Sequence, residues 1–240
     1  RSMMEAQMQE LARRRPEYRS FSLDDLRRQG YLAPERTYYN YKRCGFHTPT
    51  GKFELLSTEM AKAGVDPLPS WHEPSETPVS APELTDKYPL ILTTGGRQQP
   101  YFVSNNRQIR SLRRMEPFPL VRMHPAAARK YGLAEGDWAW IETPRGRITQ
   151  KVKLEPEMAE NVVSCDFGWW YPEAGAPGYG WDESNANILT IAAPPYDRYL
   201  GSYQLRALLC RVYPNPNCKI EARYKAWMNA TPETEQTESL

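Results

Sequence analysis

The chain has 240 residues and a formal net charge of +2, with 40% hydrophobic and 25% charged residues. This composition is typical of a globular protein, and the near-neutral charge excludes a nucleic-acid-binding protein that relies on bulk electrostatic attraction. No apolar run approaches the roughly 20 residues that a membrane-spanning helix needs. The four cysteines, Cys44, Cys165, Cys210 and Cys218, form no C-x-x-C pair, so no zinc or iron–sulfur site is predicted in this chain.

Residues 1–45 are predicted to be a helical and irregular segment. Residues 5–29 have a helical composition that Pro16 interrupts, with Ser22 and Asp25 as a capping pair and Gly30 as the helix end. The first residues lack the apolar core of a signal peptide and resemble the start of an excised piece, so no compartment is predicted from them.

Residues 46–87 are predicted to be a connector that ends in a proline-rich linker. Thr48-Pro49-Thr50-Gly51 has the residues of a turn, and residues 52–56 alternate as a short strand would. Five prolines between residues 64 and 87 favour an extended, semi-rigid chain that runs over a surface.

Short strands separated by turns follow from Tyr88 onward and predict a compact β barrel. A short helix is expected at residues 126–131, between Pro125 and Gly132, and residues 227–240 are expected to be a polar tail. Strands are expected at residues 90–92, 117–123, 138–143, 148–154, 161–165 and 203–212, the third and fourth of them forming a hairpin.

Two loops of this barrel carry groups suited to a ligand. The first follows the strand at 90–92 and begins at the glycine pair Gly95-Gly96, which breaks that strand and allows backbone N–H groups to approach a ligand closely. Arg97 and Arg107 lie on either side of polar residues in this loop, an arrangement that suits an anion with many acceptors. The alternative interpretation is an ordinary strand-to-loop turn on the protein surface, where glycine-rich turns are common.

The second loop follows Gly168 and is rich in aromatic residues, with Trp169, Trp170, Tyr171 and Trp181. A loop of this length is often functional, but tryptophans could equally fill the core beneath it. We expect the two loops to meet at one rim of the barrel, because each follows an apolar strand and each carries the unusual groups.

Catalysis by this chain alone is not predicted. The three histidines, His47, His72 and His124, all lie beside turn signals, and no nucleophile is paired with a base. His124 precedes Pro125 and is expected to be structural. Cys44 and His47 are three residues apart, but nothing supplies the other half of a metal site.

Several ordered motifs resemble one family. These are GFHTPTGKFEL, TTGGR with SNNRQ, RMHPAAARKYGLAEGDWAWIETPRGRI, VVSCDFGWWYPE and SNANILT, which together span about residues 38–213. They resemble the C-terminal, molybdopterin-dinucleotide-binding domain of the dimethyl sulfoxide reductase family. GWWYPE and the SNNRQ spacing are nearest to the acetylene hydratase, polysulfide or thiosulfate reductase and catechol dehydroxylase branches.

The resemblance implies a mainly β fold with short helices, in which residues 88–226 form a double-psi β barrel after the N-terminal connector. It also implies a bis(molybdopterin guanine dinucleotide) cofactor that carries molybdenum or tungsten, bound by the whole enzyme. The cofactor-binding residues carried over from the family are Thr94, Gly95, Gly96, Arg97, Ser104, Arg107, Gln108, Trp169, Trp170 and Asn187. No residue of this chain is expected to be catalytic or to bind the metal.

The resemblance further implies that the chain is the C-terminal portion of a larger oxidoreductase, inactive alone. A metal ligand and any [4Fe-4S] cluster are then expected in preceding domains, with an iron–sulfur electron-transfer subunit as a further partner. The chain departs from some relatives at residues 101–103, where Tyr-Phe-Val stands in place of a segment with histidine. The alternative function is a non-catalytic double-psi barrel that recognises a substrate or a partner protein.

Overall fold

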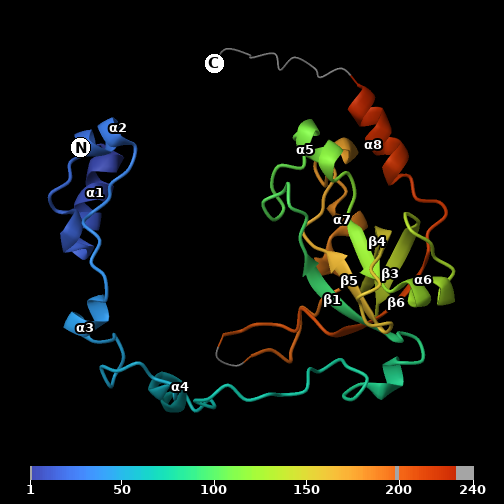
Figure 1. Ribbon diagram of the computed structural model, residues 1–240, viewed down its shortest axis with the longest axis horizontal. Coiled ribbons are helices and arrows are strands. Elements are labelled where there is room, and N and C mark those ends of the chain that lie inside the picture. Colours follow the sequence, from blue (N-terminus) through green and yellow to red (C-terminus); the bar gives the residue numbers. More distant parts are fainter. Residues whose placement is uncertain (1, 198–199, 231–240) are drawn as a thin grey trace. The chain divides into compact units, whose positions relative to one another are not determined.

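The computed structural model describes residues 2–197 and 200–230 of the chain, which divides into two compact units, Arg1–Pro69 and Ser70–Leu240 (Figure 1). Among these residues, the structure has no helix with the length and apolar character of a membrane span. In the first unit, none of the described side chains is buried. The second unit contains the barrel and both predicted ligand loops.

The first unit consists of short helices whose ends follow the sequence signals. Its helices are α1 (Met3–Arg14), η1 (Pro16–Tyr18), α2 (Leu23–Gln29), α3 (Asn40–Cys44) and α4 (Thr58–Lys62). Ser22 and Asp25 form a reciprocal capping box, and Gly30 ends α2 in the left-handed conformation at φ 76°. The predicted break at Pro16, the cap and the stop are therefore confirmed.

The predicted strand at residues 52–56 is wrong, whereas the turn before it is confirmed. Gly51 donates a backbone hydrogen bond to Thr48 O at 3.0 Å, which closes the turn. Beyond it, the Glu54 carboxylate accepts hydrogen bonds from the hydroxyl groups of Thr50 and Thr58. These local side-chain contacts hold the segment in an irregular conformation, and no strand lies beside it among the described residues.

The second unit is built on a closed six-stranded barrel, so the predicted fold class is confirmed. The strands follow the order β1-β5-β2-β4-β3-β6 around the barrel, and two neighbouring pairs, β1–β5 and β2–β4, are parallel. The strand bounds are β1 (Leu90–Gly96), β2 (Leu120–Met123), β3 (Trp138–Thr143), β4 (Gly146–Leu154), β5 (Val162–Asp166) and β6 (Leu208–Pro214).

Alternating side chains of these strands fill the barrel. Leu92, Val121, Ile141 and Val163 are each fully buried, and they come from four different strands. Since successive side chains of a strand point to opposite faces, this alternation directs one apolar row of each strand inward. Full closure also removes exposed strand edges.

Three strands differ from the prediction by three or more residues at one end. β2 begins at Leu120 rather than at residue 117. β1 runs through the glycines to Gly96 rather than ending at Leu92, because Thr93 and Thr94 pair with β5 and the register shifts only between Thr94 and Gly96. The closing strand begins at Leu208 rather than at residue 203, since Leu208 is the first residue of that segment to pair with β1.

Short helices cover the barrel and connect its strands. The helix α6 (Pro125–Lys130) is confirmed, and His124 caps it by accepting a hydrogen bond from Ala126 N at 3.1 Å, which is the expected structural role. The others are η2 (Pro82–Leu84), α5 (Arg110–Met115), η3 (Pro172–Ala174), α7 (Trp181–Ser184), η4 (Ala186–Ile188) and α8 (Ile220–Asn229). α8 extends into the predicted tail as far as Asn229, and residues 231–240 lie outside the described residues.

The proline-rich segment before the barrel is irregular apart from η2, as predicted, but one of its residues is fixed to the barrel. Glu76 is 6% exposed and accepts hydrogen bonds from Arg145 Nη1 at 2.6 Å and from Leu209 N at 3.0 Å. A buried carboxylate paired in this way holds the segment against β6.

Candidate functional site

The two predicted ligand loops meet at one end of the barrel. Arg107 Nε, in the loop after β1, donates to Gly168 O at 3.2 Å, and Trp170 Nε1, in the loop after β5, donates to Ser104 O at 2.6 Å. Arg97 and Trp169 also line the same small space between the loops. The expected shared rim is therefore confirmed.

The glycine pair at the start of the first loop is required for two different reasons. Gly95 has φ +106°, a conformation that residues with a side chain rarely adopt, and its Cα faces the Arg206 guanidinium. Gly96 is required for space, because a Cβ there would lie 2.6 Å from Asp166 Oδ1 and 2.9 Å from Arg122 Nη1.

A buried polar network supports this turn from below. Asp166 is fully buried and accepts hydrogen bonds from Arg122 Nη1 at 2.7 Å and from Leu120 N at 2.9 Å. Gln150 accepts from Asp166 N at 3.0 Å and donates to Asp166 O at 2.8 Å. These contacts join β2, β4 and β5 where β1 ends, so the backbone at Gly96 rests on a fixed surface.

Gly96→Ala is expected to destabilise the second unit by about 1–3 kcal/mol, because the added methyl group overlaps a carboxylate that its own partners hold in place. Urea unfolding of the chain measures this change. Gly178→Ala is the matched control, since Gly178 has open space around its Cα and an ordinary backbone conformation. Equal stability of the two variants would contradict the close packing at Gly96.

The polar cleft is the space between the glycine turn, the second loop and the segment before β6. It has a volume of about 200 Å³ and is lined by polar groups of Thr94, Gly95, Arg97, Asn187 and Arg206, with Phe167, Ala186, Thr190 and Leu205 completing its walls. Arg97 and Asn187 are exposed there. Two guanidinium groups beside a glycine backbone and an amide suit an anionic ligand with many acceptors.

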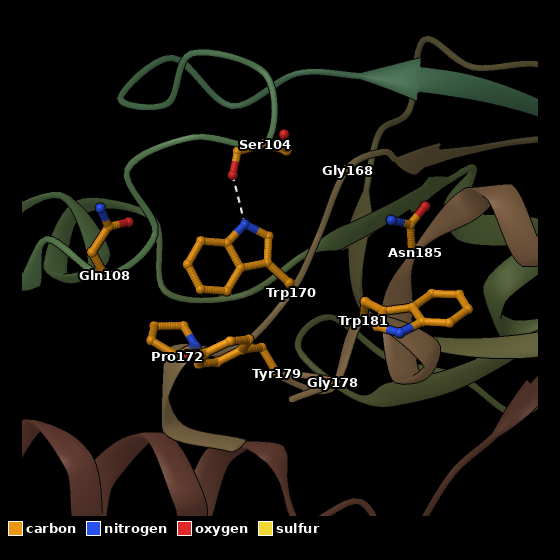
Figure 2. Close-up of a pocket in the computed structure, with 9 residues that line it drawn as sticks. All are labelled: Ser104, Gln108, Gly168, Trp170, Pro172, Gly178, Tyr179, Trp181 and Asn185. Carbon is orange, nitrogen blue, oxygen red and sulfur yellow. Dashed lines mark hydrogen bonds between the residues drawn. The ribbon is translucent and has the colours of Figure 1, made fainter. Parts of the chain in front are cut away.

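The aromatic cleft lies beside the polar cleft and has a volume of about 540 Å³. Trp170, Pro172, Tyr179 and Trp181 form its apolar walls, as Figure 2 shows. Its remaining lining residues are Ser104, Gln108, Gly168, Gly178 and Asn185. The clefts are neighbours along the chain, since Phe167 lines one and Gly168 the other.

The predicted site residues are therefore divided between two clefts and a buried layer. Thr94, Gly95, Arg97 and Asn187 line the polar cleft, whereas Ser104, Gln108 and Trp170 line the aromatic cleft. Gly96, Arg107 and Trp169 instead line the small space between the loops.

Arg107 and Trp169 are 2% and 1% exposed, so their side chains are part of the interior rather than of an open binding surface, and their contact with the cofactor stays a prediction. The Arg107 guanidinium lies 4.5 Å from the centre of the Tyr101 ring and 4.2 Å from that of Trp169. Burial lowers the pKa of Arg107 to about 10, so the side chain remains charged at neutral pH. The burial of Trp169 supports the alternative interpretation, in which a tryptophan fills the core under the loop.

Arg206 was not predicted as a site residue. It reaches the polar cleft because β6 pairs with β1 in antiparallel orientation, with Leu208 opposite Leu92, which brings the preceding residues beside Gly95. That pairing joins segments far apart in the sequence, and no local motif marks it. Trp181 was noted in the aromatic loop, but its position in a cleft depends on the same long-range packing.

The donor set fits a pterin dinucleotide. Gln98 Oε1 and Arg107 Nη1 are buried without a hydrogen-bond partner in the described part of the chain, and both residues line the small space beside Arg97. That space has a volume of only about 10 Å³ and admits no ring, so the fit depends instead on the guanidinium groups, the amide and the glycine backbone that line the polar cleft. No group of three or more His, Cys, Asp or Glu in the described residues could hold a metal ion. Elemental analysis of the purified chain tests the prediction that the chain alone binds no metal.

Comparison with known proteins gives the same assignment. Residues 90–208 match the model of the molydopterin dinucleotide binding domain. Acetylene hydratase of Syntrophotalea acetylenica is 40% identical over 151 residues, which are 62% of this chain and 21% of that protein. Dopamine dehydroxylase of Eggerthella lenta is 39% identical over 173 residues, which are 70% of this chain and 17% of that protein.

A solved structure, acetylene hydratase from Pelobacter acetylenicus, matches with a TM-score of 0.70 and 32% sequence identity. The match covers 86% of this chain and 29% of the acetylene hydratase chain. The chain thus spans about a fifth of the length of the two curated relatives. The barrel, the matched domain and these relatives together show that the chain carries a molydopterin dinucleotide binding domain and belongs to the dimethyl sulfoxide reductase family of molybdopterin enzymes.

Proposed function

We propose that this chain is the portion of a bis(molybdopterin guanine dinucleotide)-dependent oxidoreductase that holds the cofactor at the barrel rim. The observation that carries this proposal is the polar cleft, where the glycine turn, Arg97 and Asn187 come together from two loops separated by about 70 residues of sequence. The apolar barrel beneath it holds these groups in place.

Within the polar cleft, each group has a role that its chemistry supports. Arg97 and Arg206 offer guanidinium groups for the pyrophosphate of the dinucleotide, since planar guanidinium donors match phosphate oxygens. Asn187 offers an amide with both donor and acceptor atoms for the edge of a pterin. When bound, the cofactor supplies the redox chemistry of molybdenum or tungsten, and the protein orients it.

The whole enzyme requires parts that this chain does not contain. The metal ligand and any [4Fe-4S] cluster belong to the remaining domains of the same enzyme, and an iron–sulfur subunit would exchange electrons with it. The relatives that match here are several times longer than this chain, which supports further domains as its main partners.

Arg97→Ala in the whole enzyme is expected to lower cofactor occupancy. A charge-assisted hydrogen bond contributes about 1.5–3 kcal/mol, so its loss weakens binding roughly 10-fold or more. Pterin content, measured by fluorescence after oxidation, and metal content report occupancy, while circular dichroism reports folding. The fold should persist because Arg97 is an exposed loop residue.

Arg129→Ala provides the matched control, since Arg129 is an exposed arginine on α6 that lines neither cleft. Occupancy should stay at the wild-type level in this variant. If the Arg97 and Arg129 variants retain equal amounts of pterin, Arg97 does not bind the cofactor.

A further inference from the structure

A short strap before the barrel, residues 75–77, is fixed at a buried carboxylate. Glu76 accepts two hydrogen bonds from the Arg145 guanidinium, at 2.6 and 3.0 Å, and one from Leu209 N at 3.0 Å. Arg145 Nε donates in turn to Leu189 O at 2.7 Å. Because Glu76 is buried and both of its carboxylate oxygens accept hydrogen bonds, the strap is held in one position against the barrel.

Gln204 joins this strap to the segment before β6. Its Oε1 accepts from the Ser75 hydroxyl at 2.8 Å and from Glu76 N at 3.2 Å. Its Nε2 group donates to Arg206 O at 3.2 Å, to Ala207 O at 3.1 Å and to Glu76 O at 3.3 Å, so these three acceptors share two N–H groups. One side chain therefore links two segments that are 128 residues apart in the sequence.

The backbone that Gln204 contacts carries the Arg206 side chain of the polar cleft. Ala207 has φ +59°, a conformation that is unfavourable for a residue with a side chain, so the turn between Arg206 and β6 requires support from its neighbours. Thr94 Oγ1 donates to Leu205 O at 2.6 Å, which ties the same segment to β1. Within the described residues the Arg206 guanidinium has no hydrogen-bond or ion-pair partner, so its backbone decides where it lies.

We infer that the strap is part of the cofactor site and that Gln204 is the positioning residue for Arg206. The strap fixes Gln204, Gln204 fixes the backbone at Arg206, and Arg206 offers its guanidinium to a pyrophosphate in the polar cleft. The inference rests on the proposed function, because it concerns the anion that this cleft binds. The connector before the barrel, and not only the two rim loops, therefore contributes to the affinity of the cleft for that anion.

The test uses the full chain and inorganic pyrophosphate, with binding followed by ³¹P NMR. Arg206→Ala should weaken binding about tenfold, because a charge-assisted hydrogen bond is lost. Gln204→Met keeps the length of the side chain but removes its hydrogen-bonding atoms, and should weaken binding about fivefold. Gln29→Met is the matched control and should bind as the wild type does, since Gln29 is an exposed glutamine in α2 that lines neither cleft.

A double-mutant cycle separates positioning from a general loss of structure. If Gln204 acts through Arg206, Gln204→Met has little further effect when Arg206 is already alanine. A general structural role would weaken binding by the same factor in both backgrounds. Ser75→Ala is a milder second variant, because it removes one contact of the strap with Gln204 at an exposed position, and it should weaken binding about twofold. Circular dichroism shows whether each variant is folded.

The inference is overturned if Gln204→Met binds pyrophosphate as tightly as the wild type, if its effect is the same factor in the Arg206→Ala background, or if the wild type binds no pyrophosphate. These results leave the Arg97 experiment unchanged, because that experiment measures the pterin content of the whole enzyme. Equal pterin content in the Arg97 and Arg129 variants would instead contradict the proposed function, whatever the pyrophosphate titrations give.

Discussion

Replacing Arg113 by methionine is expected to lower the free energy of unfolding of the second unit by about 3–5 kcal/mol, the cost of leaving one partner of a buried ion pair alone. Arg113 and Glu173 are 0% and 1% exposed in their side chains, and two hydrogen bonds of 2.8 and 3.2 Å join them. The pair links α5 to η3, and so links the two loops that form the clefts.

Desolvation decides the size of this effect. Bringing both charges into the interior costs several kcal/mol, which the pair regains only while its geometry is complete. The rings of Trp169, Tyr224 and Trp227 surround the guanidinium at 5.1–5.6 Å, so water has little access to an unpaired Glu173. The double variant Arg113→Met with Glu173→Leu should therefore be more stable than the single Arg113 variant.

Urea unfolding, followed by circular dichroism, measures these differences. Lys153→Met is the matched control, because the Lys153–Glu135 pair is 46% and 52% exposed and should contribute at most about 1 kcal/mol. A loss below about 1 kcal/mol for Arg113→Met would show that the buried pair does not hold the loops together.

Arg107→Leu is expected to destabilise the same unit by about 2–4 kcal/mol and to loosen both clefts. The carbonyl oxygens of Gly168 and Val103 lose their hydrogen-bond donors, and a hydrogen bond from a charged donor contributes about 1.5 kcal/mol or more. Leucine also lacks the planar group that packs against the rings of Tyr101 and Trp169.

Hydrogen exchange should locate this change. Faster exchange is expected for residues 100–108 and 168–181, while β3 and β4 keep their protection. Arg114→Leu is the matched control, since Arg114 is an exposed arginine in the following helix. Unchanged exchange in both loops of the Arg107 variant would contradict the linking role of this side chain.

Local signals predicted much of the fold. The break at Pro16, the capping box at Ser22, α6 and the β3–β4 hairpin each depend on neighbours in the sequence, and each was found. The parallel pairings were not predicted, because they join segments brought together only when the barrel closes. The ends of β1 and β6 depend on the same pairings.

The candidate site, like the fold, was predicted only where local sequence is sufficient. The glycine turn and the aromatic loop could be found from residue types, and their meeting could be predicted from the strands before them. The burial of Arg107 and Trp169 could not, because an arginine or a tryptophan suits a ligand contact and an interior position equally well. The contacts of Tyr101 with Arg107 and Trp169 show that both side chains are interior, and these contacts form only in the folded chain.

The most direct test of the central claim is the structure of the whole enzyme with its cofactor bound. The account predicts that the pyrophosphate or pterin of the dinucleotide lies within hydrogen-bond distance of Arg97, Asn187 or the backbone N–H groups at Gly95 and Gly96. A cofactor that contacts no residue of the polar cleft would contradict it.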